Sequence, residues 1–70
     1  MEAKELLGRI VIDPKIMVGK PVIKGTRLTV QHILELIAQG LTTEDIMQEH
    51  KNVTKEDILA CLLFSSKIET

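Results

Sequence analysis

Apolar and polar residues follow a helical period in the middle of the chain. The apolar positions recur at i, i+3, i+4 and i+7, and they are Val30, Ile33, Leu34 and Ile37. Thr29 stands just before the first of them, where a hydroxyl can cap the free N–H groups of a helix. Gly40 follows the last of them, and glycine readily adopts the left-handed conformation that ends many helices. The pattern predicts a helix that begins at Val30 and stops at Gly40.

A repeated six-residue sequence pattern predicts two further helices. The segments LTTEDI (41–46) and VTKEDI (53–58) share an apolar residue, a Thr, an acid three residues after that Thr, and an Ile. Thr42 with Asp45 and Thr54 with Asp57 have the spacing of capping boxes, with Asp in place of the usual Glu. We predict a second helix over about residues 43–50 and a third over about residues 55–68, joined by a tight turn.

These three helices give the outline of a helix-turn-helix unit. Periodicity alone weighs this interpretation evenly against a three-helix core that has no role with DNA. We expect a mainly α fold: a three-helix, homeodomain-like helix-turn-helix bundle with a short N-terminal β-ribbon.

The chain before the helices is expected to be extended. RIVID (9–13) is rich in β-branched residues and stops at Asp13-Pro14, because a residue before proline is driven out of the helical region. RLT (27–29) alternates in polarity, and we expect it to pair with RIVID. PKIMVG (14–19) is expected to form one helical turn closed by Gly19, and Gly25 to adopt a positive φ angle.

This pattern indicates one domain, residues 1–70. It comprises a loose N-terminus (1–8), a β-ribbon and loop (9–29) and a three-helix unit (30–70). Structural roles are expected for Asp13, Pro14, Gly19, Pro21, Gly25 and Gly40.

The third predicted helix carries ILACLLF (58–64), which is apolar nearly all round. Such a helix is buried on more than one side, and a chain of 70 residues with 44% hydrophobic content is too small to cover all of it. We therefore expect a homodimer. The interface candidates are Leu59, Leu62, Leu63 and Phe64, while Cys61 is interpreted as a core thiol.

Charge is divided unevenly along the chain. The net charge is −1, but residues 1–34 carry six basic and three acidic residues, whereas residues 35–70 carry three basic and seven acidic ones. The two halves, at +3 and −4, suit different partners. The candidate contacts to DNA phosphates are Lys20, Lys24, Arg27, Lys51 and Lys55. Glu56 and Asp57, beside the last two, would repel phosphate.

Several chemistries are excluded by residue spacing. A single cysteine forms no intramolecular disulfide, and His32, His50 and Cys61 lack zinc-site spacing. Gly19 and Gly25 lack the spacing of a phosphate-binding loop. We expect no catalytic residue, metal, cofactor or small-molecule substrate. The charged N-terminal segment and the absence of a long apolar run predict a cytoplasmic protein with no membrane partner.

A stretch of about residues 10–66, nearly the whole chain, resembles the bacterial family called domain of unknown function 433. The resemblance rests on an I-x-x-D-P start at residues 10–14 and on GKPVIKGTR at residues 19–27, followed by a helix, a glycine and two E-D-I helices. His50-Lys51-Asn52 departs from the family, which often has an aromatic residue and a proline before the third helix. The resemblance implies a small dimeric helix-turn-helix-like protein, and some members resemble antitoxins of the VapB kind encoded beside a PIN-like ribonuclease.

Two functions follow from these expectations. The first is a non-catalytic, antitoxin-like protein that binds double-stranded promoter DNA and a PIN-like toxin. The second is a protein-interaction and dimerisation module that does not bind DNA. Arg27 is ambiguous, because its guanidinium can clamp a carboxylate such as that of Asp13 or bind a phosphate.

Overall fold

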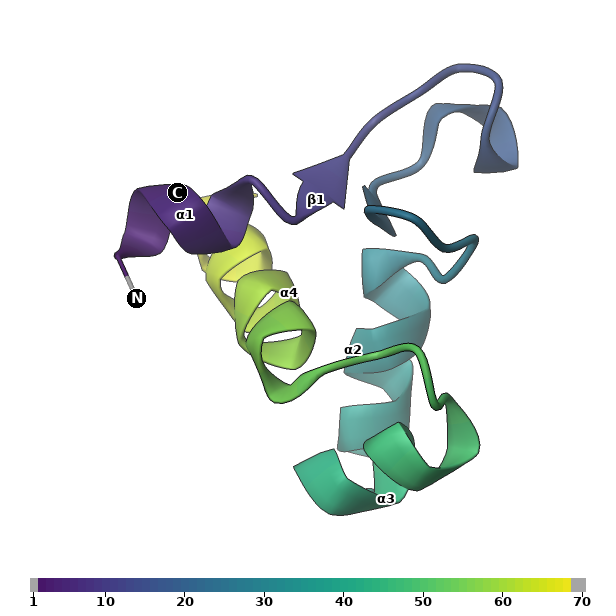
Figure 1. Ribbon diagram of the computed structural model, residues 1–70, viewed down its shortest axis with the longest axis vertical. Coiled ribbons are helices and arrows are strands. Elements are labelled where there is room, and N and C mark those ends of the chain that lie inside the picture. Colours follow the sequence, from purple (N-terminus) through teal and green to yellow (C-terminus); the bar gives the residue numbers. More distant parts are fainter. Residues whose placement is uncertain (1, 69–70) are drawn as a thin grey trace.

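A computed structural model describes residues 2–68 and places them in a mainly helical fold with a short antiparallel sheet (Figure 1). The elements in chain order are α1 (Ala3–Leu7), β1 (Ile10–Val11), the single turn η1 (Met17–Gly19), β2 (Val22–Ile23), α2 (Val30–Ala38), α3 (Thr43–Glu49) and α4 (Lys55–Ile68). The three predicted helices are confirmed, and their bounds differ from the prediction by no more than one or two residues.

The starts of these helices are capped as their sequences indicate. Thr29 Oγ1 accepts a hydrogen bond from His32 N at 3.0 Å. In the first capping box, Asp45 N donates to Thr42 Oγ1 and Thr42 N donates to the Asp45 carboxylate. Thr54 and Asp57 make the same reciprocal pair at the start of α4. Each box satisfies N–H groups that a helix start leaves unpaired.

The end of α2 is a Schellman motif. Gly40 has a φ angle of 99°, Gly40 N donates to Ile37 O at 2.9 Å, and Leu41 N donates to Leu36 O at 3.2 Å. A residue other than glycine would be strained at this φ angle, so the sequence stops the helix here and turns the chain toward α3.

The N-terminal segment is the first correction to the sequence analysis. Residues 1–8 were expected to be loose, but Ala3–Leu7 form α1, which packs against α4 (Figure 1). Leu6 and Leu7 are half-buried. A helix of five residues is unstable alone, so α1 depends on its packing against α4. No local sequence pattern predicts this helix.

The ribbon is the second correction. Ile10 pairs with Ile23 and Val11 with Val22, so the partner of β1 is VI (22–23) and not RLT (27–29). Thr29 forms only an isolated bridge to Val22. Val22 and Ile23 are fully buried, and this burial selects them as the inner strand.

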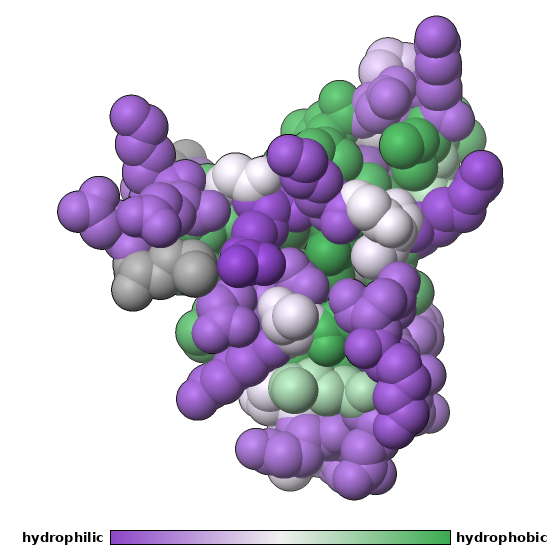
Figure 2. All heavy atoms as spheres, in the orientation of Figure 1, coloured by the Kyte–Doolittle hydropathy of each residue, from purple (hydrophilic) through white to green (hydrophobic). Residues whose placement is uncertain are grey.

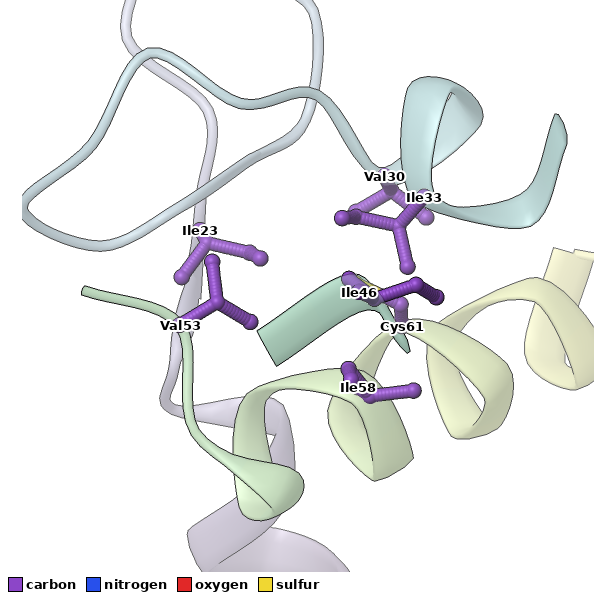
Figure 3. Close-up of a cluster of buried hydrophobic side chains, with 7 residues drawn as sticks. All are labelled: Ile23, Val30, Ile33, Ile46, Val53, Ile58 and Cys61. Atoms are coloured by element: carbon purple, nitrogen blue, oxygen red, sulfur yellow. The ribbon is translucent and has the colours of Figure 1, made fainter. Parts of the chain in front are cut away.

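The core lies where α2, α3, α4 and β2 meet (Figure 3). Its buried side chains are Ile23, Val30, Ile33, Ile46, Val53, Ile58 and Cys61. Val53 precedes the capping box of α4 and lies in the same buried cluster as Ile58. The VTKEDI pattern therefore determines both where α4 begins and how its first turn packs against the core.

α4 is less evenly buried than its composition suggests. Ile58, Ala60 and Cys61 are buried, whereas Leu59 and Leu62 are each 42% exposed. α1 packs against α4 and covers part of this helix. Within residues 2–68, no helix is both long enough and apolar enough to cross a membrane.

Candidate nucleic-acid interface

Two of the five basic candidates come together at the start of α2. Lys20 and Arg27 line one surface hollow of about 320 Å³, together with Gln31 and His32 from the first turn of α2. Both cations are exposed. The hollow also holds Glu35, one helical turn further on, so its charge is mixed but predominantly basic.

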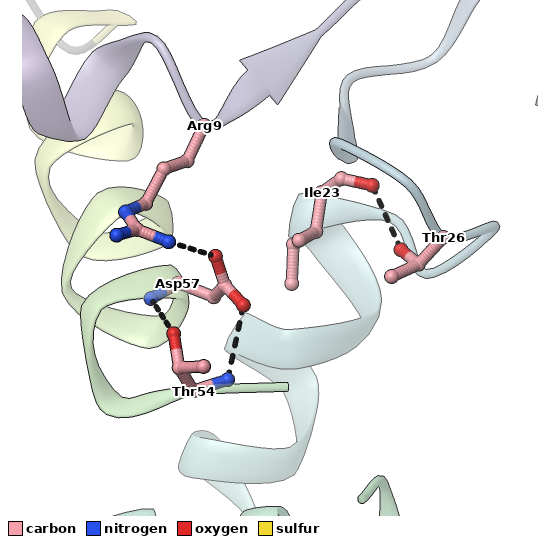
Figure 4. Close-up of polar contacts among 5 residues, drawn as sticks. All are labelled: Arg9, Ile23, Thr26, Thr54 and Asp57. Carbon is pink, nitrogen blue, oxygen red and sulfur yellow. Dashed lines mark hydrogen bonds and ion pairs between the residues drawn. The ribbon is translucent and has the colours of Figure 1, made fainter. Parts of the chain in front are cut away.

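The loop between β2 and α2 positions these two cations. Gly25 has a φ angle of 82°, and Thr26 Oγ1 donates to Ile23 O at 2.8 Å while accepting from Leu28 N at 3.0 Å (Figure 4). Val30 N donates to Pro21 O at 2.9 Å and closes the loop at its base. The Gly25–Thr26 turn therefore has a structural role, and it places Arg27 at the surface.

Lys24 lies in a different place. It lines a hollow of about 430 Å³ with Glu5, Gly8, Arg9 and Asp57, beside the start of α4. Lys51 and Lys55 are exposed in the α3–α4 connection and first turn of α4, and neither lines the hollow of Lys20 and Arg27. The basic candidates therefore do not form one surface patch as a set.

An ion pair that local sequence patterns do not reveal joins the N-terminal segment to α4. Arg9 Nη1 donates to Asp57 Oδ1 at 3.1 Å, while Asp57 Oδ2 accepts from Thr54 N at 3.0 Å (Figure 4). The two partners are 48 positions apart in the sequence. The Asp57 side chain is 9% exposed, so its charge is compensated at a mostly buried site.

The carboxylate clamp considered for Arg27 is not present. Asp13 Oδ1 accepts a hydrogen bond from Lys15 N at 2.9 Å, as expected for a turn at Asp13-Pro14. The ion pair found in residues 2–68 is that of Arg9 with Asp57. Arg27 is exposed, so its guanidinium is accessible to an external ligand.

The candidate dimer residues on α4 lie in two settings. Leu59 and Leu62 project outward, whereas Leu63 and Phe64 are half-buried and Phe64 packs against the core. Cys61 is a core thiol, as predicted: it is fully buried, and desolvation, with a smaller contribution from Asp57, raises its pKa to about 12. A thiol in this state is a poor nucleophile.

The two histidines lie closer together than their sequence spacing indicates. The ring of His32 on α2 and that of His50 after α3 have centroids 6.0 Å apart in an edge-to-face arrangement. No group of three or more His, Cys, Asp or Glu side chains in residues 2–68 could hold a metal ion. The pair is accounted for as an aromatic contact between α2 and the residue that follows α3.

Comparisons with known proteins place this architecture in one family. An uncharacterized protein from Archaeoglobus fulgidus is 73% identical over 22 residues, which are 31% of this chain and 61% of that protein. A crystal structure of a DUF433 member protein from Anabaena variabilis superposes with a TM-score of 0.82 at 23% identity, over 91% of this chain and 63% of that one. The chain thus spans about three-fifths of the length of each. The model of the family described as "Protein of unknown function (DUF433)" matches residues 10–65, and the chain belongs to this family.

Proposed function

We propose that the chain is a non-catalytic, dimeric, helix-turn-helix-like protein of the cytoplasm that binds its own promoter DNA and a PIN-like toxin, as an antitoxin does. The observation that carries the DNA-binding part is the exposed pair Lys20 and Arg27 in one hollow at the start of α2. Two cations beside a helix start suit a DNA phosphate, because the helix dipole adds to their attraction.

The order of the helices supports the same proposal. α3 and α4 are joined by a short connection after α2, which is the succession found in helix-turn-helix domains. In a homodimer, two copies of the Lys20–Arg27 hollow would meet two half-sites of a symmetric operator.

The acids at the start of α4 oppose this proposal less than their charges suggest. Asp57 is 6% exposed and its carboxylate is engaged by Arg9 and Thr54, so it does not face an approaching phosphate as a free charge. Glu56 is half-buried, and Lys51 and Lys55 are exposed nearby. These two lysines remain candidates for a second phosphate contact.

The DNA-binding proposal predicts a specific change in salt dependence. Lys20→Gln with Arg27→Gln removes two phosphate contacts, so the slope of log K against log salt concentration should fall in magnitude by about 1.8. Affinity should fall evenly across DNA sequences, because phosphate contacts carry no base information. The measurement is a salt titration of binding to a duplex from the protein's own upstream region.

The matched control removes two exposed charges elsewhere. Lys4→Gln with Lys67→Gln changes net charge equally on α1 and α4 and should leave the slope near the wild-type value. Lys51→Gln with Lys55→Gln then shows whether the start of α4 also contacts DNA. Wild-type protein that fails to bind DNA even at low ionic strength would contradict the DNA-binding proposal.

A second candidate function is a protein-interaction module without DNA binding. It is favoured by Leu59 and Leu62, two large exposed side chains at i and i+3 on one face of α4. This half of the chain is acidic, so the partner would present an apolar patch with basic residues around it. Binding of such a partner, without any salt-dependent DNA binding, would identify this function.

A further inference from the structure

Three large hydrophobic side chains lie exposed on one projecting segment between β1 and β2. Val18 is 91% exposed, Ile12 is 61% exposed and Met17 is 40% exposed. Figure 2 shows hydrophobic atoms in separate groups at the upper right, where Figure 1 places this segment, with hydrophilic atoms between and around them. We call Ile12, Met17 and Val18 the apolar knob. Single exposed hydrophobic residues are ordinary, but three large ones within residues 12–18 leave an unusual amount of apolar side chain in solvent on one short segment.

The backbone of the apolar knob is strained. Met17 and Val18 have φ angles of 50° and 56°, and Gly19 continues the left-handed turn at 78°. Only glycine adopts this region freely, and a β-branched residue such as Val18 is unfavourable there. The turn is held by hydrogen bonds from Gly19 N to Ile16 O (3.1 Å) and from Lys20 N to Met17 O (3.2 Å). The side chain of Val18 lies in solvent, so packing within one chain does not offset this strain. The strain therefore indicates that Val18 has a role in contacting another molecule.

A groove of matching chemistry lies next to the knob. It has a volume of about 250 Å³ and is lined by Pro21, Val30, Leu34 and Phe64, with Lys20 and Ser65 among its polar lining residues. We call it the apolar groove. It is smaller than the roughly 300–1,000 Å³ of typical small-molecule sites. The side chains of Met17 and Val18 together fill about 200 Å³, if each heavy atom takes roughly the 30 Å³ of a water molecule in the liquid.

The knob and the groove are adjacent on the same molecule, since Lys20 and Pro21 line the groove and follow Val18 by two and three residues. If two copies are related by a two-fold axis beside these surfaces, the knob of each copy meets the groove of the other. The same contact is then made twice. We propose that the apolar knob of one copy inserts into the apolar groove of a second copy, reciprocally. This inference rests on the proposed homodimer and moves its centre from Leu59 and Leu62 to Val18 and Phe64.

The first test uses a substitution that suits the monomer. Asn is the residue other than glycine that best tolerates a left-handed conformation, so Val18→Asn removes the apolar side chain and relieves strain. It should weaken self-association at least about tenfold in sedimentation velocity measured across concentrations. At a dilution where the wild type is monomeric, its melting temperature should equal or exceed that of the wild type. The matched control, Leu62→Asn, alters the other exposed apolar surface and should leave self-association unchanged.

The second test locates the contact. Val18→Cys and Ser65→Cys are prepared as separate proteins, so that a short bismaleimide crosslinker can join them only between copies. Cys61 is buried and does not compete. The mixture should give a crosslinked dimer, whereas Val18→Cys mixed with Leu59→Cys should give little.

Three results would overturn the inference: wild-type protein that sediments as a monomer at high micromolar concentration, self-association lost in Leu62→Asn but kept in Val18→Asn, or no crosslink between residues 18 and 65. Its failure differs from failure of the DNA-binding proposal. A dimer that depends on Val18 but binds no DNA supports this inference and contradicts the other, and salt-dependent DNA binding by a monomer does the reverse.

Discussion

Gly25 is held at a φ angle of 82°, with nothing within 4 Å of the place a Cβ atom would take. A side chain there would meet strain from the backbone alone. Gly25→Val should therefore lower the free energy of unfolding by about 1 kcal/mol or more, as measured by urea denaturation. Gly25→Asn is the control and should lose less, because Asn tolerates this region. Equal losses in the two variants, or none in Gly25→Val, would contradict this account.

Asp45 and Asp57 occupy equivalent positions in the two repeated sequence patterns, but only Asp57 also binds Arg9. Asp57→Ala removes a helix cap and leaves the guanidinium of Arg9 without its partner, so the free energy of unfolding should fall by about 2 kcal/mol or more. Asp45→Ala removes only a cap and should lose less. Adding Arg9→Met to each variant completes a double-mutant cycle, and equal coupling of Arg9 to both acids would refute the assignment.

The capping box of α3 makes its stability dependent on pH. Hydrogen bonds from the Thr42 backbone N–H and, to a smaller extent, from the Thr42 side chain lower the pKa of Asp45 below its ordinary value. The unfolded chain, with an Asp pKa of about 3.9, then binds the proton more readily than the folded one. The contribution of this carboxylate is present above about pH 4 and is lost as the pH falls through the folded-state pKa.

Asp45→Asn should consequently flatten the acid side of the stability profile, measured as urea midpoints between about pH 2 and pH 7. Glu44→Gln is the control: it removes a charge from the same first turn but leaves the Thr42 hydrogen bonds in place, so its slope should follow the wild type. If Asp45→Asn keeps the wild-type slope, the box does not supply this pH dependence.

In the molecule as a whole, the GKPVIKGTR segment has two roles. Val22 and Ile23 pair with β1 and enter the core, and the Gly25–Thr26 turn redirects the chain into α2. Lys20 and Arg27, at the two ends of this structural section, remain at the surface in one hollow. The segment thus has mainly a structural role and also carries two exposed basic residues. The apolar knob lies directly before it in the sequence.

The sequence by itself determined the three long helices, their caps, the Schellman end at Gly40 and the positive φ angle of Gly25. These features depend on hydrogen bonds and backbone preferences that span at most a few residues, so a short window contains their causes. Burial of Cys61 also followed from its position in an apolar helix, because such a helix must cover its central residues.

The tertiary structure alone decided the formation of α1, the pairing of Ile10 with Ile23, and the ion pair between Arg9 and Asp57. It also separated Lys24 from Lys20 and Arg27, and it left Val18 in solvent. Each of these depends on where distant segments meet, since burial and charge compensation are properties of surfaces brought together in space. No window of neighbouring residues contains that information, because the partner that completes each contact lies elsewhere in the chain.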